Sequence, residues 1–304
     1  MSNINILSVN LSKNRGPKFP VKEITLSPNG VEGDVHADSV RPVSIFAIHH
    51  AEKFTGLTGG RKPNFGEFAE NITIDGLQET EVKVFDCFRS GNTELEVIKV
   101  GKPFHDEFHE LGNYVMPRVG IFCRVTKSGK LKKGDVFSFV PKYFRILIIT
   151  LSDRASKGIY EDLSGPAVKG HVEKLFSKNK KRFDIESLII PDDPEQLTQY
   201  LLFGKTKFDV IFTTGGTGIG PKDFTVDVVK PMLDKEIPGI MEMIRMKYGI
   251  EKPKAYLSRG VAGVMGQSLI YNLPGSVKAV NEYMAEIAKT LDHLIYMQHG
   301  IDVH

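Results

Sequence analysis

Apolar runs that alternate with helix-like segments begin near residue 144 and constrain the second half of this chain more than any other feature. Runs of strand length occupy residues 145–151, 183–190, 208–214 and 267–273. Apolar side chains at helical spacing occupy residues 164–176, 194–202, 225–233, 237–246 and 278–297, the last as one long amphipathic helix. Strands that alternate with helices predict a doubly wound α/β domain, whose mainly parallel sheet is covered on both faces.

The first half has a different texture, because short β-branched and aromatic pieces dominate it. Strand-like pieces occupy residues 21–26, 41–48, 71–74, 82–88, 94–100, 120–125 and 135–140. Only residues 48–57 look helical. The pattern predicts a mostly-β, barrel-like domain. Pro141 interrupts strand pairing where the texture changes, so we expect two domains, residues 1–142 and 143–304.

Composition argues against several classes of protein. The 40 basic and 37 acidic residues leave a net charge of +3, which is too small to indicate nucleic-acid binding. No apolar run reaches the roughly 18–20 residues that span a bilayer, and the first residues lack the layout of a secretion signal. Cys87 and Cys123 are too few for a disulfide scaffold and suit a reducing compartment. We therefore expect a soluble cytoplasmic protein without nucleic-acid or membrane partners.

A glycine-rich turn lies in the stretch TTGGTGIGPKDFTVDVV, directly after a predicted strand. Its glycines are Gly215, Gly216, Gly218 and Gly220. Glycine lets the backbone approach a ligand closely and point N–H groups at an anion. The spacing fits neither a P-loop, because Pro221 follows the last glycine, nor the G-x-G-x-x-G dinucleotide motif. A tight turn without a ligand is the alternative, but the carboxyl end of a parallel strand favours a phosphate site.

Two acidic positions near the predicted strand ends need separate interpretations. Asp193 precedes Pro194, a favoured first helical residue, which predicts that Asp193 caps the helix and leaves Asp192 without an evident structural role. Asp223 could cap the next helix, but Thr225 competes for that position. Two carboxylates beside a phosphate turn suit Mg²⁺ that bridges phosphate oxygens. The alternative is a pair of solvated loop acids.

The second half resembles the MogA/MoaB family of molybdenum cofactor biosynthesis, and more closely its MogA branch. The motifs that carry the resemblance run in family order: SDRASKGIYED, LIIPDD, TTGGTGIGPKDFT, EIPGIMEMIR and YLSRGVAGVMGQSLIYNLPGS. The resemblance implies a doubly wound α/β fold, a homotrimer and adenylylation of molybdopterin. In that reaction the terminal phosphate of the pterin attacks the α-phosphate of Mg·ATP and pyrophosphate leaves. Mg²⁺ is then the cofactor, with ATP and molybdopterin as substrates.

The resemblance also assigns residues. The family's two essential aspartates fall on Asp192 and Asp223, which we expect to hold Mg²⁺ through the phosphates. Substrate and nucleotide contacts are expected at the strand ends and in the glycine turn, from Ser152, Arg154, Thr214, Gly215, Gly216, Thr217, Gly218, Ser258, Asn272, Pro274, Gly275 and Ser276. Two departures are small: Val226 stands where the family usually has proline, and Lys222 where MogA-like members often have arginine. Neither removes a reacting group.

Residues 8–140 resemble the MOSC domain, named for molybdenum cofactor sulfurases. The matching stretches include GVEGDVHADSVRPVSI, FGEFAENITIDGL and VMPRVGIFCRVTKSGKLKKGDVF. The resemblance implies a β-barrel-like fold that binds molybdopterin-type cofactors, and many relatives carry sulfur as a cysteine persulfide. Phe104 stands where those relatives have the cysteine, which disfavours sulfur transfer. His36, Arg41 and Asn71 are candidates for an anionic pocket, with turn hydrogen bonding or surface charge as the alternatives.

The remaining cysteines and one histidine pair have ordinary interpretations. Cys87 and Cys123 lie in strand-like runs, where a small buried hydrophobe is expected rather than a reactive thiol. His105 and His109 are four residues apart, as zinc-binding pairs are, but no third ligand is evident and zinc is disfavoured.

The leading hypothesis is a molybdopterin adenylyltransferase with a cofactor-binding MOSC-like module in front of it. Its partners would be other proteins of the molybdenum cofactor pathway, those of metal insertion among them. The alternative is a non-catalytic carrier or storage protein for molybdopterin or the molybdenum cofactor. MOSC-based sulfur transfer is a further alternative, which Phe104 disfavours.

Overall fold

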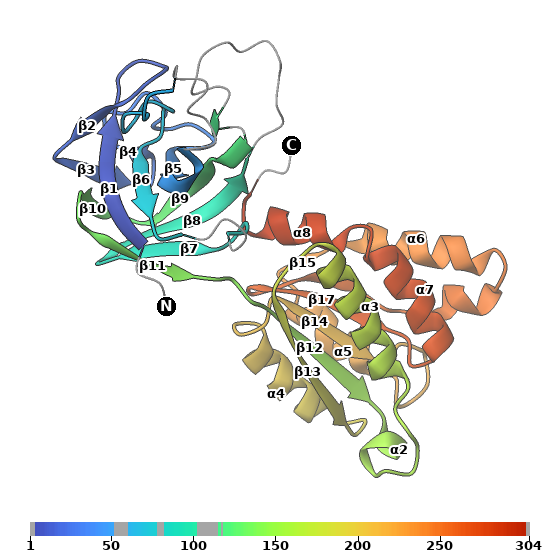
Figure 1. Cartoon of the computed structure of the whole chain (residues 1–304). Coiled ribbons are helices and arrows are strands. Elements are labelled where there is room, and N and C mark those ends of the chain that lie inside the picture. The colour runs from blue at the N-terminus through green and yellow to red at the C-terminus, as the bar shows by residue number, and fades with distance from the viewer. Residues whose placement is uncertain (1–3, 52–59, 78–81, 102–114, 117, 302–304) are drawn as a thin grey trace. The chain divides into compact units, whose positions relative to one another are not determined.

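The computed structural model of the chain describes residues 4–51, 60–77, 82–101, 115–116 and 118–301. The chain divides into two compact units, Met1–Lys142 and Tyr143–His304 (Figure 1). The first unit is built mainly from strands, and the second alternates strands with helices. Within the described residues, no helix combines the length and the apolar character that crossing a membrane requires.

A closed β-barrel forms the first unit. The strands are β1 (Ile4–Leu11), β2 (Phe19–Val21), β3 (Glu23–Ser27), β4 (Gly30–Val31), β5 (Val43–Ala47), β6 (Ile72–Asp75), β7 (Cys87–Ser90), β8 (Thr93–Val100), β9 (Ile121–Lys127), β10 (Gly129–Lys132) and β11 (Val136–Val140). The ring runs β11–β7–β8–β9–β5–β6–β1, and β1 closes it by pairing with β11. All pairs in the ring are antiparallel except β5 with β6. β2 extends β1 outside the ring, and β10, β3 and β4 form a separate small sheet.

Alternation along the strands places apolar side chains inside the barrel. In β1, Ile4 and Ile6 are buried while Asn5 between them is exposed. These isoleucines join one core cluster with Phe88 of β7 and Phe137 of β11, whose ring centroids lie 5.5 Å apart. A strand with one buried face has this period of two. The barrel-like domain expected from the sequence is therefore confirmed.

Two local expectations in the first unit need correction. Of the helix predicted over residues 48–57, residues 48–51 form a 3-10 turn, and residues 52–57 lie outside the described part. The strand predicted over residues 82–88 forms only at its end, in β7. Phe85 has a φ of 77°. The carboxylate of Asp86 accepts a hydrogen bond from the backbone N–H of Lys83 at 2.7 Å. A left-handed residue and a side-chain-capped turn both interrupt strand pairing.

A mixed sheet with helices on both faces forms the second unit. Its strands are β12 (Phe144–Leu151), β13 (Phe183–Ile190), β14 (Val210–Thr214), β15 (Lys235–Glu236), β16 (Ala262–Met265) and β17 (Ser268–Leu273). Its helices are α2 (Asp153–Ser156), α3 (Ser164–Lys178), α4 (Pro194–Gly204), α5 (Thr225–Val229), η2 (Lys230–Met232), α6 (Pro238–Gly249), η3 (Pro253–Leu257), α7 (Val277–Ile287) and α8 (Leu291–Gln298). The sheet order is β13–β12–β14–β17–β16–β15; the first four strands are parallel, and β16 is antiparallel to both neighbours. The mainly parallel sheet thus has an antiparallel edge that the sequence did not predict.

Burial along the strands follows their positions in the sheet. The interior strand β12 is buried at seven of its eight residues, as expected for a parallel strand covered on both faces. β13 forms the edge, and its residues are exposed or partly buried except for the buried Ile190 at its end. One apolar cluster joins Leu197 and Leu201 of α4 to the sheet, together with Val226 of α5. α3 and α7 pack against each other over the sheet (Figure 1), so helices cover both faces.

The long helix predicted over residues 278–297 is in fact two helices, α7 and α8. Glu286, near the end of α7, is 4% exposed, and its carboxylate accepts a hydrogen bond from the Lys289 ammonium at 2.7 Å. The Thr290 hydroxyl donates to the carbonyl of Ile287 at 3.3 Å. A side chain that bonds to a nearby carbonyl competes with the helical ladder, which accounts for the break.

The connectivity of the sheet creates a crevice at its carboxyl edge. β12 lies between β13 and β14, although the chain visits β12, β13 and β14 in that order. The connections that follow β12 and β13 therefore lead to opposite sides of β12. In open α/β sheets, ligands bind beyond the carboxyl ends of the strands at such a switch point.

Candidate functional site

A pocket of about 370 Å³ opens at the carboxyl ends of β12, β13 and β14. Its lining residues are Leu151, Ser152, Asp153, Arg154, Asp192, Gly216, Lys222 and Asp223. Five of the residues named from the sequence therefore lie together: Ser152, Arg154, Asp192, Gly216 and Asp223. Asp153 and Lys222 were not among the predicted site residues.

The glycine turn after β14 requires glycine at two positions. Gly215 has a φ of 108°, and a Cβ there would lie 2.5 Å from the carbonyl oxygen of Leu151. Gly216 has a φ of 64°, and a Cβ there would collide with the hydroxyl of Thr225. That hydroxyl donates instead to the carbonyl of Gly215 at 2.9 Å. The loop backbone is therefore held close to β12 on one side and to α5 on the other.

Asp223 closes the far end of this loop. One carboxylate oxygen, Oδ2, accepts a hydrogen bond from the backbone N–H of Gly220 at 2.8 Å, and the Asp223 N–H donates to the Gly220 carbonyl at 2.9 Å. Neither Asp223 nor Thr225 makes a capping hydrogen bond to α5. The geometry thus fixes the Asp223 carboxylate at the pocket and leaves its other oxygen, Oδ1, without a protein donor among the described residues.

Asp192 and Asp153 hold each other across the strand ends. The backbone N–H of Asp153 donates to the carboxylate of Asp192 at 3.2 Å, and the N–H of Asp192 donates to the carboxylate of Asp153 at 3.1 Å. The Lys222 ammonium forms an ion pair with Asp153 and lowers the pKa of that carboxyl. The ion pair of Lys222 with Asp153 connects the glycine loop to the start of α2. The sequence signal for Asp153 was its place directly after the first apolar run, in the motif SDRAS.

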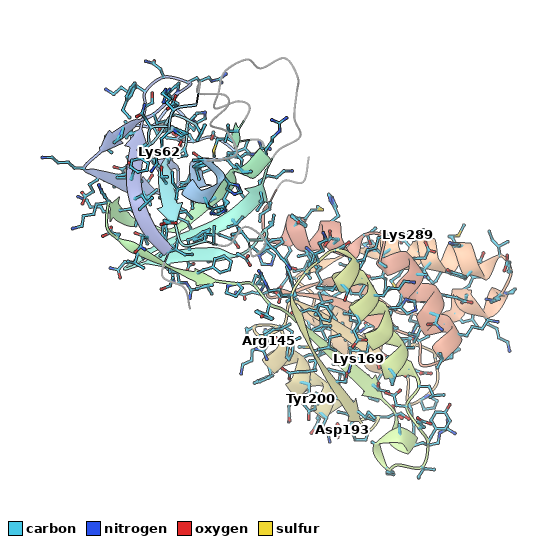
Figure 2. The ribbon with its side chains drawn as sticks, in the orientation of Figure 1. Lys62, Arg145, Lys169, Asp193, Tyr200 and Lys289 are labelled. Atoms are coloured by element: carbon cyan, nitrogen blue, oxygen red, sulfur yellow. The ribbon has the colours of Figure 1, made fainter. Side chains whose placement is uncertain are left out.

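Asp193, which is labelled in Figure 2, caps a helix as its position before Pro194 predicted, and so differs from its neighbour Asp192. The carboxylate of Asp193 accepts from the backbone N–H groups of Glu195 and Gln196, at 2.8 and 3.1 Å. It caps α4 and does not line the pocket. The two adjacent aspartates therefore have different environments.

Other residues named from the sequence lie beside the glycine loop. The Thr214 hydroxyl donates to the carbonyl of Pro274 at 2.8 Å, and Gly275 lies against Gly215. The Ser276 hydroxyl accepts from the N–H of the third residue of α7 and caps that helix.

Asn272 and Ser258 serve the protein's own structure. The Asn272 side chain is fully buried and donates to the Thr213 hydroxyl at 2.7 Å, while its Oδ1 atom accepts no hydrogen bond from the part of the chain that the structure describes. The Ser258 hydroxyl accepts from the N–H of Gly260 at 3.4 Å. Arg154 is exposed and its guanidinium lies 5.2 Å from the centre of the Tyr160 ring.

Arg259 is a residue of this region that sequence reasoning missed. Its Nε donates to the carbonyl of Gly218 at 2.7 Å, and its Nη2 donates to the carbonyl of Asp223 at 2.5 Å. Both guanidinium ends also contact the Asp227 carboxylate, at 2.8 and 2.9 Å. The arginine stands in the motif YLSRGV, where its charge gave no sign of a partner twenty or more residues away.

The chemistry of the pocket fits a magnesium ion that shares its ligands with phosphate. Mg²⁺ prefers oxygen ligands and usually takes one or two carboxylates, with waters and substrate phosphates completing its shell. Asp192 and Asp223 supply two carboxylates in one pocket. Among the described residues there is no group of three or more acidic, histidine or cysteine side chains arranged to hold a metal alone. The donor set therefore suits an ion that arrives with a phosphate ligand.

The candidate residues of the barrel have well-defined structural contacts. Asn71 is buried, and its carboxamide oxygen accepts from the Ser44 N–H and hydroxyl at 3.1 and 3.0 Å. The Arg41 guanidinium lies 5.7 Å from the centre of the Phe122 ring. The side chain of His36 is 40% exposed. Phe104, His105 and His109 lie outside the described residues.

The thiols of the barrel are held in their neutral form. Burial raises the pKa of Cys87 to about 11, and the nearby carboxylates of Glu94 and Glu96 act in the same direction. Burial also raises the pKa of Cys123, which is fully buried. A thiol that stays protonated at neutral pH is a poor nucleophile. The expectation that neither is a reactive thiol agrees with these environments.

Comparison with known proteins identifies both units. A family model described as "Probable molybdopterin binding domain" matches residues 147–293, and a MOSC domain model matches residues 32–138. The gephyrin of Dictyostelium discoideum is 36% identical over 155 residues, which cover 49% of this chain and 21% of that protein. The molybdopterin adenylyltransferase of Helicobacter pylori strain J99 is 35% identical over 150 residues, which cover 49% of this chain and 84% of that enzyme. The molybdopterin adenylyltransferase of Pyrococcus furiosus is 36% identical over 161 residues, which cover 51% of this chain and 91% of that enzyme.

The fold and these matches define an α/β protein of the molybdopterin-binding class with a MOSC domain in the same chain. The chain belongs to the MogA/MoaB family of molybdenum cofactor biosynthesis proteins through its second unit. The relatives named above match only about half of this chain, which is the half that contains the pocket.

Proposed function

We propose that the second unit transfers an adenylyl group from ATP to molybdopterin. The observation that carries this proposal is the shared pocket of Asp192, Asp223 and the glycine loop at the switch point of the sheet. The named activity of the Helicobacter and Pyrococcus relatives supports it.

The chemistry asks for positioning and charge neutralisation rather than for a general base. A phosphate monoester such as that of molybdopterin is ionised near neutral pH, with a second pKa of about 6. Two anionic phosphates must be brought together in line, and fixed N–H groups and cations lower their repulsion. When bound, Mg²⁺ supplies part of that neutralisation on the phosphate oxygens.

Each residue of the pocket has a proposed role. Asp192 and Asp223 hold Mg²⁺, and Asp153 keeps the Asp192 backbone in place. Lys222, paired with Asp153 in this structure, contributes a positive charge at the mouth of the pocket. The remaining contacts to nucleotide and pterin come from Ser152, Arg154, Thr214, Gly215, Gly216, Thr217, Gly218, Pro274, Gly275 and Ser276, while Ser258 and the buried Asn272 support the pocket through their structural contacts.

For the first unit we propose a module that binds molybdopterin or a related cofactor without sulfur transfer. The high pKa of Cys87 and the burial of Cys123 support the absence of sulfur transfer. We further propose that the chain assembles as a homotrimer. Met246 of α6 and Leu257 of η3 are 60% and 61% exposed, which provides apolar surface for a second copy to cover.

Substitution of the adjacent aspartates tests the catalytic proposal. We expect Asp192→Asn and Asp223→Asn to reduce formation of adenylylated molybdopterin by about 100-fold or more, the scale on which one electrostatic contact to a transition state acts. Asp193→Asn is the matched control, because this residue caps α4 outside the pocket and should keep the activity. Product is separated chromatographically and quantified. Retained activity in both site variants would contradict the proposal, and binding of molybdopterin without product in the wild type would favour a carrier.

A further inference from the structure

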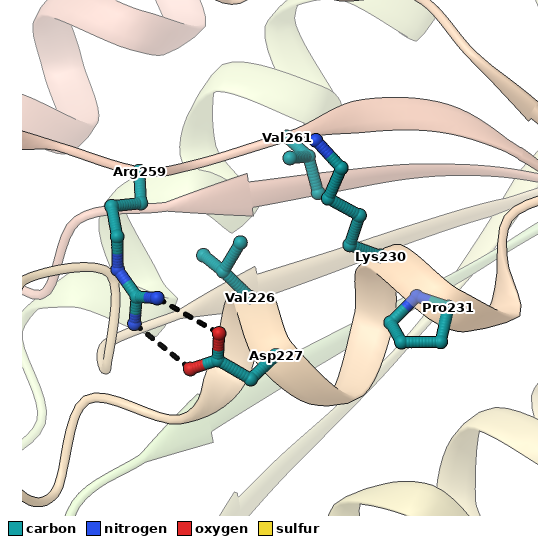
Figure 3. Close-up of a pocket in the computed structure, with 6 residues that line it drawn as sticks. All are labelled: Val226, Asp227, Lys230, Pro231, Arg259 and Val261. Atoms are coloured by element: carbon teal, nitrogen blue, oxygen red, sulfur yellow. Dashed lines mark hydrogen bonds and ion pairs between the residues drawn. The ribbon is translucent and has the colours of Figure 1, made fainter.

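A second pocket, also of about 370 Å³, lies beside α5 in the same unit, and Arg259 forms part of its wall (Figure 3). The other lining residues are Val226, Asp227, Lys230, Pro231 and Val261. At this pocket the guanidinium of Arg259 is in direct contact with the Asp227 carboxylate, and Lys230 lies farther along the helical segment. Arg259 therefore separates this pocket from the glycine loop that ends at Asp223.

Arg259 contacts the glycine loop at both ends. At one end its backbone N–H donates to the carbonyl of Thr217 at 2.9 Å, and its Nε donates to the carbonyl of Gly218 at 2.7 Å. At the other end its Nη2 donates to the carbonyl of Asp223 at 2.5 Å. One side chain thus fixes the distance between the start and the end of the loop.

The other contacts hold the loop at single points: Lys222 pairs with Asp153 of α2, and the Thr225 hydroxyl donates to the carbonyl of Gly215. Ile219, at its tip, is 81% exposed, and the next three residues are exposed as well. Inside the loop, Gly220 and Asp223 are joined by two hydrogen bonds, one in each direction. Glycine-rich backbone has the most conformational freedom to lose on ordering. A contact that joins both ends of such a loop therefore restricts it more than a contact at one end.

Asp227 keeps the guanidinium in position. Its two carboxylate oxygens accept from Nη1 and Nη2 of Arg259, at 2.8 and 2.9 Å, in a bidentate pair. A planar guanidinium can make these contacts and the two carbonyl contacts at once, whereas the single ammonium of lysine cannot match that geometry. The function of the pair is therefore geometric as well as electrostatic.

We propose that Arg259 is a positioning residue that sets the place of the Asp223 carboxylate in the pocket, with Asp227 as its anchor. The inference rests on the proposed role of Asp223 in holding Mg²⁺ with phosphate. Arg259 does not line the substrate pocket itself and acts through the loop backbone.

Hydrogen–deuterium exchange of the full-length chain tests the structural part of this inference directly. In Arg259→Lys, the amide groups of Gly220, Asp223 and Thr225 should exchange about 10- to 100-fold faster, the factor that corresponds to losing a hydrogen bond to a charged group. Amides of β12 and β14 should exchange as in the wild type. Asp227→Asn should give a smaller increase at the same amides. Lys230→Gln is the control, because Lys230 lines the same pocket but pairs with Glu236. This variant should leave exchange of the loop amides unchanged.

Adenylyl transfer by the same variants tests the functional part. Arg259→Lys should require about tenfold more Mg²⁺ for half-maximal rate, while Lys230→Gln matches the wild type. Unchanged loop exchange in Arg259→Lys, or faster exchange spread evenly over the whole unit, would overturn the inference. Faster loop exchange with an unchanged Mg²⁺ requirement would also overturn it. If the wild type transfers no adenylyl group, the proposed function fails, and the exchange result still decides whether Arg259 orders the loop.

Discussion

At the scale of single residues, the most unusual feature of the barrel is a buried ion pair. Lys18 Nζ lies 2.5 Å from the Asp34 carboxylate, and both side chains are fully buried. Asp34 also accepts hydrogen bonds from the backbone N–H groups of Ser12 and His36, at 3.2 and 3.0 Å. Burial alone would raise the pKa of Asp34, but hydrogen bonds from His36 and Lys18 outweigh it and hold the pKa below its usual value.

Removal of one partner should therefore destabilise the barrel strongly. We expect Lys18→Met or Asp34→Asn to lower the free energy of unfolding of the first unit by about 3–5 kcal/mol, because each leaves a buried charge unpaired. The double variant should cost less than the sum of the single ones. Lys130→Met serves as the control, since the pair of Lys130 with Glu23 is exposed and should contribute no more than about 1 kcal/mol. Urea titration of each full-length variant measures these differences, and additive effects would contradict the prediction.

The same pair predicts how stability depends on pH. A carboxyl whose pKa is lowered in the folded state stabilises the fold above the unfolded pKa of about 3.9, and this contribution is lost as pH falls toward the folded pKa. We expect the first unit of the wild type to lose stability progressively below about pH 4, and Asp34→Asn to show a smaller slope there. Thermal unfolding between pH 2 and pH 6 checks this, and equal slopes would contradict it.

The reactivity of the two thiols can be predicted from their pKa values. With a pKa of about 11 for Cys87 and a buried, raised pKa for Cys123, we expect neither to react with iodoacetamide at pH 7.5 while the chain is folded. The urea-unfolded chain provides the control, because both thiols should then be alkylated. Mass spectrometry counts the adducts, and rapid alkylation of folded Cys87 would reopen the question of sulfur chemistry.

At the scale of elements, the glycine turn after β14 combines two separate demands on the backbone. Gly215 needs both a positive φ and space beside the Leu151 carbonyl. Gly158, after α2, has a φ of 68°, but apart from its chain neighbours no described residue has an atom within 4 Å of where a Cβ would lie. A Cβ at Gly158 would therefore meet backbone strain alone, whereas a Cβ at Gly215 would meet both backbone strain and a steric clash.

Alanine at these positions should have unequal effects. We expect Gly158→Ala to cost about 1 kcal/mol of stability, for the left-handed backbone alone. Gly215→Ala should cost about 2–3 kcal/mol and reduce adenylyl transfer, because the loop must move away from β12. Chemical denaturation and the product assay measure both, and a Gly215→Ala variant as stable as Gly158→Ala would contradict the prediction.

Much of the architecture followed from patterns that act within one element. The buried run of β12 and the cap of α4 by Asp193 are local signals, and the structure agrees with both. The break between α7 and α8 coincides with the Thr290 hydroxyl bonding to the Ile287 carbonyl, a local contact that the apolar helical period does not report. Arg259 acts through partners distant in sequence, which no local pattern identified, and the place of Asp153 after the first apolar run gave no sign of its pairing with Lys222.

At the scale of the whole molecule, the second unit carries the whole pocket and a core of its own. The adenylyltransferases of Helicobacter and Pyrococcus match this half over 84% and 91% of their lengths. We therefore expect residues 143–304, expressed alone, to unfold cooperatively and to adenylylate molybdopterin at a rate similar to that of the full chain. The same fragment with Asp223→Asn is the control. A fragment that folds but lacks activity would show that the barrel takes part in the reaction.

The most direct test of the account follows the label from ATP into molybdopterin. Purified full-length chain is supplied with Mg²⁺, molybdopterin and ATP labelled with ³²P at either the α- or the γ-phosphate. We expect molybdopterin to acquire label from the α-position only, pyrophosphate to carry the γ-label, and Asp223→Asn to reduce both by about 100-fold or more. Label from the γ-position, or molybdopterin that binds and stays unlabelled in the wild type, would contradict adenylyl transfer.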